Sequence, residues 1–163
     1  MTKGDYILKI GPKVFNFSVI DNYVGWDTFY EFIAKYTKTL FELEILDSIK
    51  RAALRYINFF DFNIYNKSTL SVSLNNNILT DHKSNLKVEI SENKTLSVLR
   101  MSNNANMNQK SGSVIDIDCI YNSDLSSFSD NYLEIVDELH IEEKKLFFSL
   151  LQKDYLETLN PIY

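Results

Sequence analysis

Val114-Ile-Asp-Ile-Asp-Cys-Ile-Tyr121 alternates apolar and polar side chains along most of its length. Successive side chains of a β-strand point to opposite faces of the sheet, so this alternation predicts a strand with one buried face. Six other short segments show the same period, and the short spacing between them favours an antiparallel sheet over βαβ units. These segments are 6–10, 15–19, 54–60, 70–74, 86–90 and 96–99.

Two longer segments have a helical period instead. Residues 26–43 place large apolar side chains on one half of a helical wheel and charged side chains on the other, and residues 130–153 carry a similar apolar stripe. The sequence therefore predicts an α+β fold. We expect a single domain over 1–163, with a largely antiparallel sheet of about six or seven strands packed against these two helices.

The composition is that of a globular protein. The chain has 163 residues, of which 45% are apolar and 24% charged, and this balance excludes a disordered chain, a collagen-like repeat and a coiled coil. The apolar runs are too short to span a membrane, and the N-terminal residues lack the apolar stretch of a signal peptide. We therefore expect a cytoplasmic protein without membrane contact. A single cysteine, Cys119, excludes an internal disulfide.

Charge and glycine placement disfavour two classes of ligand. Residues 111–163 hold eleven acidic and three basic side chains, a balance that repels nucleic-acid phosphates. The four glycines are scattered and form no phosphate-binding loop or dinucleotide fingerprint, so we expect no cofactor.

Residues 103–113 are rich in asparagine and serine. Apart from Met107 they contain no side chain that would form a core. This composition predicts a long mobile hairpin loop rather than a linker between domains.

Asp116 and Asp118 are the weak candidates for a metal site. They point to the same face of their predicted strand, and paired carboxylates can hold Mg²⁺ or divide acid and base roles. The simpler interpretation is a polar sheet face on which basic residues neutralise them. We expect Arg55, which alternates outward from Tyr56, to reach one of these two carboxylates and to be structural.

The predicted C-terminal helix carries two ionisable residues near its buried side. His140 lies at the edge of the apolar stripe, where we interpret it as a structural histidine bonded to a neighbour. Glu143 lies in the middle of the stripe. A buried carboxylate is costly unless it is paired, so we expect Glu143 to meet a cation or backbone donors.

The opposite face of this helix carries apolar residues where polar ones would be expected. Ile141 and Phe148 point outward, Lys144 lies beside them and Leu151 flanks them. A row of apolar residues on one helix face predicts an interface with a protein partner or with a second copy as a homodimer. The alternative is that the chain's own tail, residues 155–163, folds back over the row.

Three motifs carry a resemblance to a known family. Asn22-Tyr-Val-Gly-Trp-Asp-Thr-Phe29 resembles a Tyr-x-Gly-Trp-[Asp/Glu]-x-Phe motif, and Leu54-Arg-Tyr-Ile-Asn58 resembles a Gly-Leu-Arg-Tyr-Ile-Asn strand with Ala53 in place of the glycine. Leu139-His140 followed by Phe147 or Phe148 resembles a C-terminal Leu-His…Phe helix. All three are typical of a sporadically distributed family of uncharacterised bacterial and archaeal proteins.

The resemblance implies a bacterial protein and assigns no activity. Family members tend to be longer, so the chain would correspond to the C-terminal part of their architecture. The shared residues look structural rather than catalytic: Trp26, Phe29, Arg55, Tyr56, Asn58 and His140.

Our leading functional expectation is non-catalytic binding of a protein partner within a bacterial accessory or defence-type system. One alternative is a small-ligand-binding domain of the helix-grip type, with an apolar cavity between the sheet and the second helix. Another is a metal-dependent nuclease or phosphohydrolase that uses Asp116 and Asp118.

Overall fold

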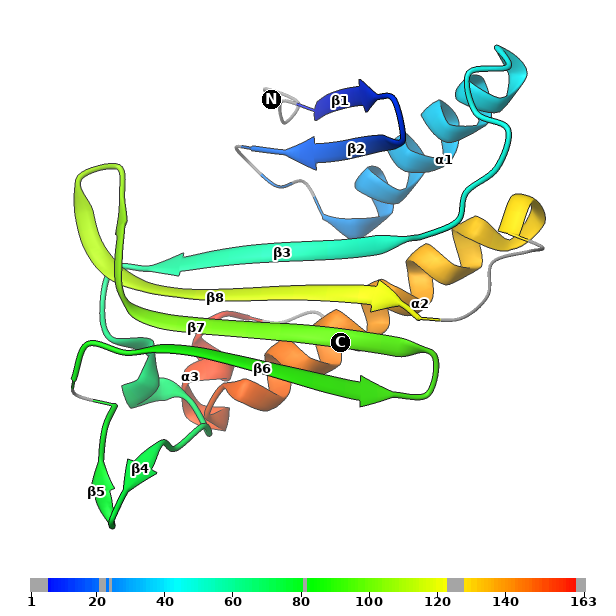
Figure 1. The fold of residues 1–163 in the computed structure, drawn as a ribbon. Helices are drawn as coiled ribbons and strands as arrows, with labels where there is room; N and C mark the ends of the chain where they lie inside the picture. Colours follow the sequence, from blue (N-terminus) through cyan, green and yellow to red (C-terminus); the bar gives the residue numbers. More distant parts are fainter. Residues whose placement is uncertain (1–5, 21–22, 24, 81, 123–127, 161–163) are drawn as a thin grey trace. The chain divides into compact units, whose positions relative to one another are not determined.

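The computed structural model describes residues 6–20, 23, 25–80, 82–122 and 128–160 and, for 128–130, the backbone alone. The chain divides into two compact units, Met1–Ser48 and Ile49–Tyr163. Both are drawn in Figure 1. The expectation of a single domain over the whole chain stays a prediction.

The N-terminal unit pairs a β-hairpin with one helix. Strands β1 (Tyr6–Gly11) and β2 (Val14–Val19) are antiparallel, in agreement with the predicted hairpin. The ring of Phe32, on the helix, stacks 4.5 Å from the ring of Tyr6 and meets Phe17 edge-on at 5.6 Å. Such aromatic pairs add to the stabilisation that burial alone provides.

Helix α1 of this unit spans Trp26–Glu42. Gly25 precedes it with a φ of 96°, a backbone conformation that glycine adopts without steric cost. The turn into the helix therefore requires the glycine of the Gly25-Trp26 motif. The helix predicted over 26–43 is confirmed to within one residue, and its buried face includes Phe29 and Ile33.

The C-terminal unit is built on a four-stranded antiparallel sheet with the strand order β3-β8-β7-β6. Figure 1 shows helix α2 running along one face of this sheet. The elements are β3 (Ala53–Phe60), η1 (Ile64–Lys67), β4 (Ser73–Leu74), β5 (Asn77–Ile78), β6 (Asn85–Glu92), β7 (Thr95–Met107), β8 (Lys110–Tyr121), α2 (Phe128–Leu150) and α3 (Lys153–Thr158).

The predicted α+β class and the antiparallel pairing are confirmed, but the strands do not share one sheet. The hairpins β1-β2 and β4-β5 each form a two-stranded sheet of their own, separate in pairing from the four-stranded sheet. Of the strand predicted over 70–74, only Ser73–Leu74 is in β-structure. Within the described ranges, no helix is long and apolar enough to cross a membrane.

The two faces of the four-stranded sheet differ in chemistry. On the helix face, Ile115, Ile117 and Cys119 of β8 are completely buried, as is Leu139 of α2. Burial of apolar surface of this kind contributes about 25 cal/mol for each Å² removed from water. The opposite face, called the charged face below, carries the alternate residues of each strand: Arg55, Ile57, Phe59, Asn85, Lys87, Glu89, Val98, Arg100, Ser102, Val114, Asp116 and Asp118.

The prediction of a long loop over 103–113 is wrong. Strands β7 and β8 pair through this segment, with a register shift between Ser102 and Ala105, and only Asn108 and Gln109 form the turn. Both turn residues have positive φ, 49° and 67°, as a tight two-residue hairpin requires. Backbone pairing with a partner strand therefore decides the conformation here, although the side chains contribute little to the core.

Gly112 permits the far end of β3 to pack against this hairpin. A Cβ atom at this position would lie 2.0 Å from the carbonyl oxygen of Phe60, and 2.9 Å from the ring of Phe59. A side chain there is incompatible with the observed distance between the strands, because real Cβ contacts are longer than 3.0 Å. The glycine thus has a packing role that its place in a polar segment does not reveal.

Helix α2 ends earlier than predicted. It stops at Leu150, and the residues that follow pair with the chain after η1: the amide of Thr69 donates to the carbonyl of Leu150, and the amide of Gln152 donates to that of Lys67. Leu151, expected on the outer helix face, forms a β-bridge with Ser68 and is only 3% exposed.

Candidate functional site

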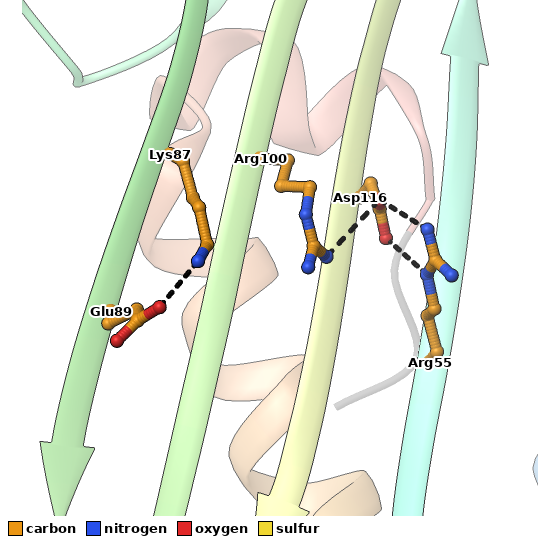
Figure 2. A network of polar contacts seen from close by, with 5 residues as sticks. All are labelled: Arg55, Lys87, Glu89, Arg100 and Asp116. Carbon is orange, nitrogen blue, oxygen red and sulfur yellow. Dashed lines mark hydrogen bonds and ion pairs between the residues drawn. The ribbon is translucent and has the colours of Figure 1, made fainter.

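The charged face holds two groups of ion pairs, called the network below, with members on all four strands (Figure 2). The two carboxylate oxygens of Asp116 accept hydrogen bonds from Nε and a terminal nitrogen of Arg55, both at 2.7 Å. Arg100 lies 3.5 Å from the same carboxylate on the other side, and Lys87 pairs with Glu89 on the edge strand β6. Each of the two carboxylates drawn in the figure therefore has at least one basic partner.

This geometry gives Asp116 a structural partner. Arg55 lies directly opposite Asp118 in the register, but its side chain reaches diagonally to Asp116. Asp116 is one of the two carboxylates that we expected Arg55 to bind. Bidentate pairs of this kind are among the strongest side-chain hydrogen bonds. Because both oxygens of Asp116 are engaged, the arrangement argues against a metal bridged by Asp116 and Asp118. Among the described residues, no group of three or more metal-ligating side chains comes together.

A hollow of about 320 Å³ lies beside the network on the charged face. Its walls include the polar side chains of Asn85, Lys87, Arg100 and Ser102. This hollow is not the cavity that the sequence predicts between the sheet and the second helix. Between those two layers lie the fully buried side chains of Ile117, Cys119 and Leu139.

The outer edge of β3 has an unusual composition. In the part of the chain that the structure describes, no strand pairs with this edge. The amide of Tyr121 donates to the carbonyl of Ala52. Because bonded and non-bonded pairs alternate along antiparallel strands, the backbone groups of the even-numbered residues of β3 bond to β8. The backbone groups of the alternate residues therefore point away from the sheet. These outward residues of β3 are Ala53, Arg55, Ile57 and Phe59.

The opposite edge of the sheet, on β6, is protected by charge. The amide of Asn103 donates to the carbonyl of Ser84, so the same alternation applies. The outward residues of β6 are Asn85, Lys87, Glu89 and Ser91. Charged side chains on an edge strand discourage pairing with other chains.

The outward residues of β3 offer no comparable protection. The single charged one, Arg55, is held by Asp116 within its own sheet, whereas the side chain of Ile57 is 57% exposed. A long apolar edge with unsatisfied backbone groups is a template for strand addition. The alternation in Leu54-Arg-Tyr-Ile-Asn58 predicts a strand but not an edge position, because strand order is a property of the fold.

The predicted interface on the outer face of α2 is only partly assembled. Ile141 is 54% exposed, but Phe148 is half-buried, with the ammonium group of Lys144 5.6 Å from its ring centroid. Leu151 is buried and lies beyond the helix, so its assignment to this interface was wrong. A single exposed isoleucine needs no partner to explain it.

Glu143 is buried, as its position in the apolar stripe predicts, with 5% of its surface exposed. The expected partner was not found: within the described residues, no hydrogen bond or ion pair engages its carboxyl group. Burial raises the pKa of Glu143 from 4.5 to about 7. The neutral acid is therefore the form that this site favours.

Two other ionisable side chains, Cys119 and His140, make contacts that are typical of structural residues. Cys119 faces the helix beside the hydroxyl of Ser97, 3.3 Å away, and burial raises the pKa of its thiol to about 11. A thiol that keeps its proton at neutral pH is a poor nucleophile. His140 lies with Nδ1 3.4 Å from the hydroxyl of Tyr56, as expected for a histidine bonded to a neighbour.

Comparisons of this chain with family models, curated proteins and solved structures gave no match. The resemblance carried by the motifs around Trp26, Arg55 and His140 therefore stays an expectation.

Proposed function

We propose that this chain is a non-catalytic protein-binding domain that accepts a β-strand of its partner along the outer edge of β3. The unpaired, apolar outer edge of β3 is the observation that carries the proposal. Strand addition supplies affinity through main-chain hydrogen bonds and specificity through alternate side chains. Here the added strand would lie beside Ile57 and Phe59 on the charged face.

The state of the reactive side chains supports a binding role over catalysis. Both carboxylate oxygens of Asp116 are bonded to Arg55, and the thiol of Cys119 is buried with a raised pKa. A catalytic group needs access to its substrate and a pKa near the working pH. The carboxylate of Asp116 is held by Arg55, and the buried thiol of Cys119 lacks such a pKa.

The family resemblance favours a bacterial accessory or defence-type system as the setting of this binding role. The cytoplasmic location is a separate expectation, drawn from the short apolar runs of the sequence. A homodimer is one form that such protein binding takes.

Small-ligand binding is the second candidate. The hollow that would hold the ligand lies on the charged face, whereas the sequence predicted a cavity on the helix face. The hollow of about 320 Å³ beside Lys87 and Arg100 supports it. Its size lies at the lower end of the range for ligand pockets. Tighter binding of small anions to the wild type than to Arg100→Gln, measured by calorimetry, would favour this candidate.

The experiment that tests protein binding uses a displayed library of random ten-residue peptides. Wild-type protein should enrich peptides with alternating apolar residues. Ile57→Pro should weaken their binding at least tenfold, because it removes an outward donor and adds a ring at the edge. Proline is tolerated where its nitrogen faces out of the sheet, so the fold should persist.

Glu89→Pro is the matched control, since the backbone nitrogen of Glu89 points out of the sheet on the opposite edge. This variant should bind the same peptides as the wild type. If a monomeric wild type enriches no peptide, or if Ile57→Pro binds the enriched peptides as well as the wild type does, the proposed function is wrong.

A further inference from the structure

The outward residues of β3 are spaced symmetrically about Tyr56. Ala53 and Phe59 lie three positions from it, and Arg55 and Ile57 lie one position from it. A second copy of β3, antiparallel and related by a two-fold axis at Tyr56, therefore sets all four outward residues opposite one another. Each opposed pair exchanges two backbone hydrogen bonds, so the edge would gain about eight. A protein interface of standard size has about ten.

Charge selects this register over its neighbours. With the axis at Tyr56, Arg55 faces Ile57 of the second copy and keeps its bond to Asp116. An axis at Arg55 would bring two guanidinium groups face to face, which destabilises a strand pair. An axis at Ile57 would set Ala53 opposite Asp61. Asp61 lies beyond the end of β3, so this register pairs fewer residues of the strand.

The helix face of the same strand is compatible with the pairing. Tyr56 would meet Tyr56 of the second copy in a non-hydrogen-bonded position, where Cβ atoms lie about 4.5–5.5 Å apart. Aromatic pairs at such positions stabilise antiparallel sheets. The chain has a formal charge of −5, but the edge contributes no acidic side chain that would repel a second copy.

These observations point to one occupant. We propose that β3 pairs with β3 of a second copy of this chain, joining the two four-stranded sheets into one sheet of eight strands about a two-fold axis at Tyr56. The inference rests on the proposed function, since it names the partner that the edge accepts. A closed two-fold contact also leaves no edge of β3 exposed to further chains.

Sedimentation velocity over a range of concentrations tests the pairing, because the chain has a mass of 19.0 kDa. The wild type should sediment at about twice this mass at micromolar concentrations, which are typical of specific association. Ile57→Pro and Ile57→Lys should raise the dissociation constant at least tenfold with unchanged circular dichroism. Glu89→Pro should remain a dimer.

A monomeric wild type, or a dimer that survives both Ile57 substitutions, overturns the inference. A dimer that Glu89→Pro dissociates as readily as Ile57→Pro overturns it as well. A monomeric wild type that still enriches strand-forming peptides in an Ile57-dependent way refutes only the second copy as the partner. Failure of both experiments refutes strand addition at β3 altogether.

Cross-linking tests the register. In a Cys119→Ala background, Tyr56→Cys should give a disulfide-linked dimer under mild oxidation, since Cα atoms about 4.5 Å apart lie within disulfide range. Ile57→Cys is the matched control, because position 57 of each copy would face Arg55 of the other copy and lie two residues away from the second position 57. Cross-linking at position 57 in place of position 56 contradicts the proposed axis.

Discussion

Replacing Glu143 by glutamine should remove a pH-dependent loss of stability from the folded protein. The carboxyl group of Glu143 is buried on the face of α2 that packs against the sheet, and burial raises its pKa to about 7. The folded protein therefore holds this proton more tightly than the unfolded chain does. The contribution of Glu143 to the free energy of unfolding should be greatest below pH 4.5 and should fall as the pH rises to 7.

The size of this effect follows from the two pKa values. A rise from 4.5 to about 7 corresponds to about 3 kcal/mol, at 1.36 kcal/mol for each pH unit. Glutamine is neutral at every pH and has nearly the same shape. Glu143→Gln should thus match the wild type at pH 4.5 and should be more stable by about 3 kcal/mol at pH 8.

The assay is urea unfolding at pH 4.5, 6 and 8, at one protein concentration. Cys119 of β8 faces the same layer but stays neutral through this window, because its pKa is about 11. The neighbouring His140 is present in both proteins, so its titration largely cancels from their difference. Glu138→Gln, an exposed position on the same helix, should leave the pH dependence unchanged.

Parallel pH curves for the wild type and Glu143→Gln would refute this reasoning. A wild type that is the more stable protein at pH 8 would refute it too, since the ionised carboxylate would then have a stabilising partner.

Three further substitutions test the account of the sheet, each by urea unfolding. Gly112→Ala should destabilise the protein by about 2–3 kcal/mol or more, because its Cβ atom would overlap the carbonyl oxygen of Phe60; a loss under 1 kcal/mol contradicts the packing argument. Arg55→Met and Asp116→Asn should show a coupling of about 1–2 kcal/mol in a double-mutant cycle, and strict additivity would mean that their hydrogen bonds contribute nothing. Gln109→Gly should stabilise the tight turn by about 0.5–1 kcal/mol, since its φ of 67° suits glycine, and a destabilised variant would contradict the turn assignment.

Local periodicity predicted the elements whose side chains bury one face. The alternation in Val114–Tyr121 gives the two faces of β8, and the helical period gives α1 and the buried side of α2. It also placed Glu143 in the buried stripe. The partner of Glu143 was wrongly expected because periodicity shows which side chains are buried, not what they meet there.

Features that depend on contacts distant in sequence were not predictable in this way. The segment 103–113 forms strands because its backbone pairs along a hairpin, a contribution that its side chains do not encode. Helix α2 stops before Leu151 because the chain beyond η1 offers a backbone partner at Ser68. The edge position of β3 follows from the strand order, which the alternation in a single strand does not determine.

Amide hydrogen exchange, resolved by residue, tests the central claim most directly. At concentrations where the wild type is associated, the outward residues of β3 should exchange slowly, and Ile57→Pro should restore fast exchange at the other three. The outward residues of β6 should exchange fast in both proteins. Fast exchange at the outward residues of β3 in the associated wild type would contradict strand addition at this edge.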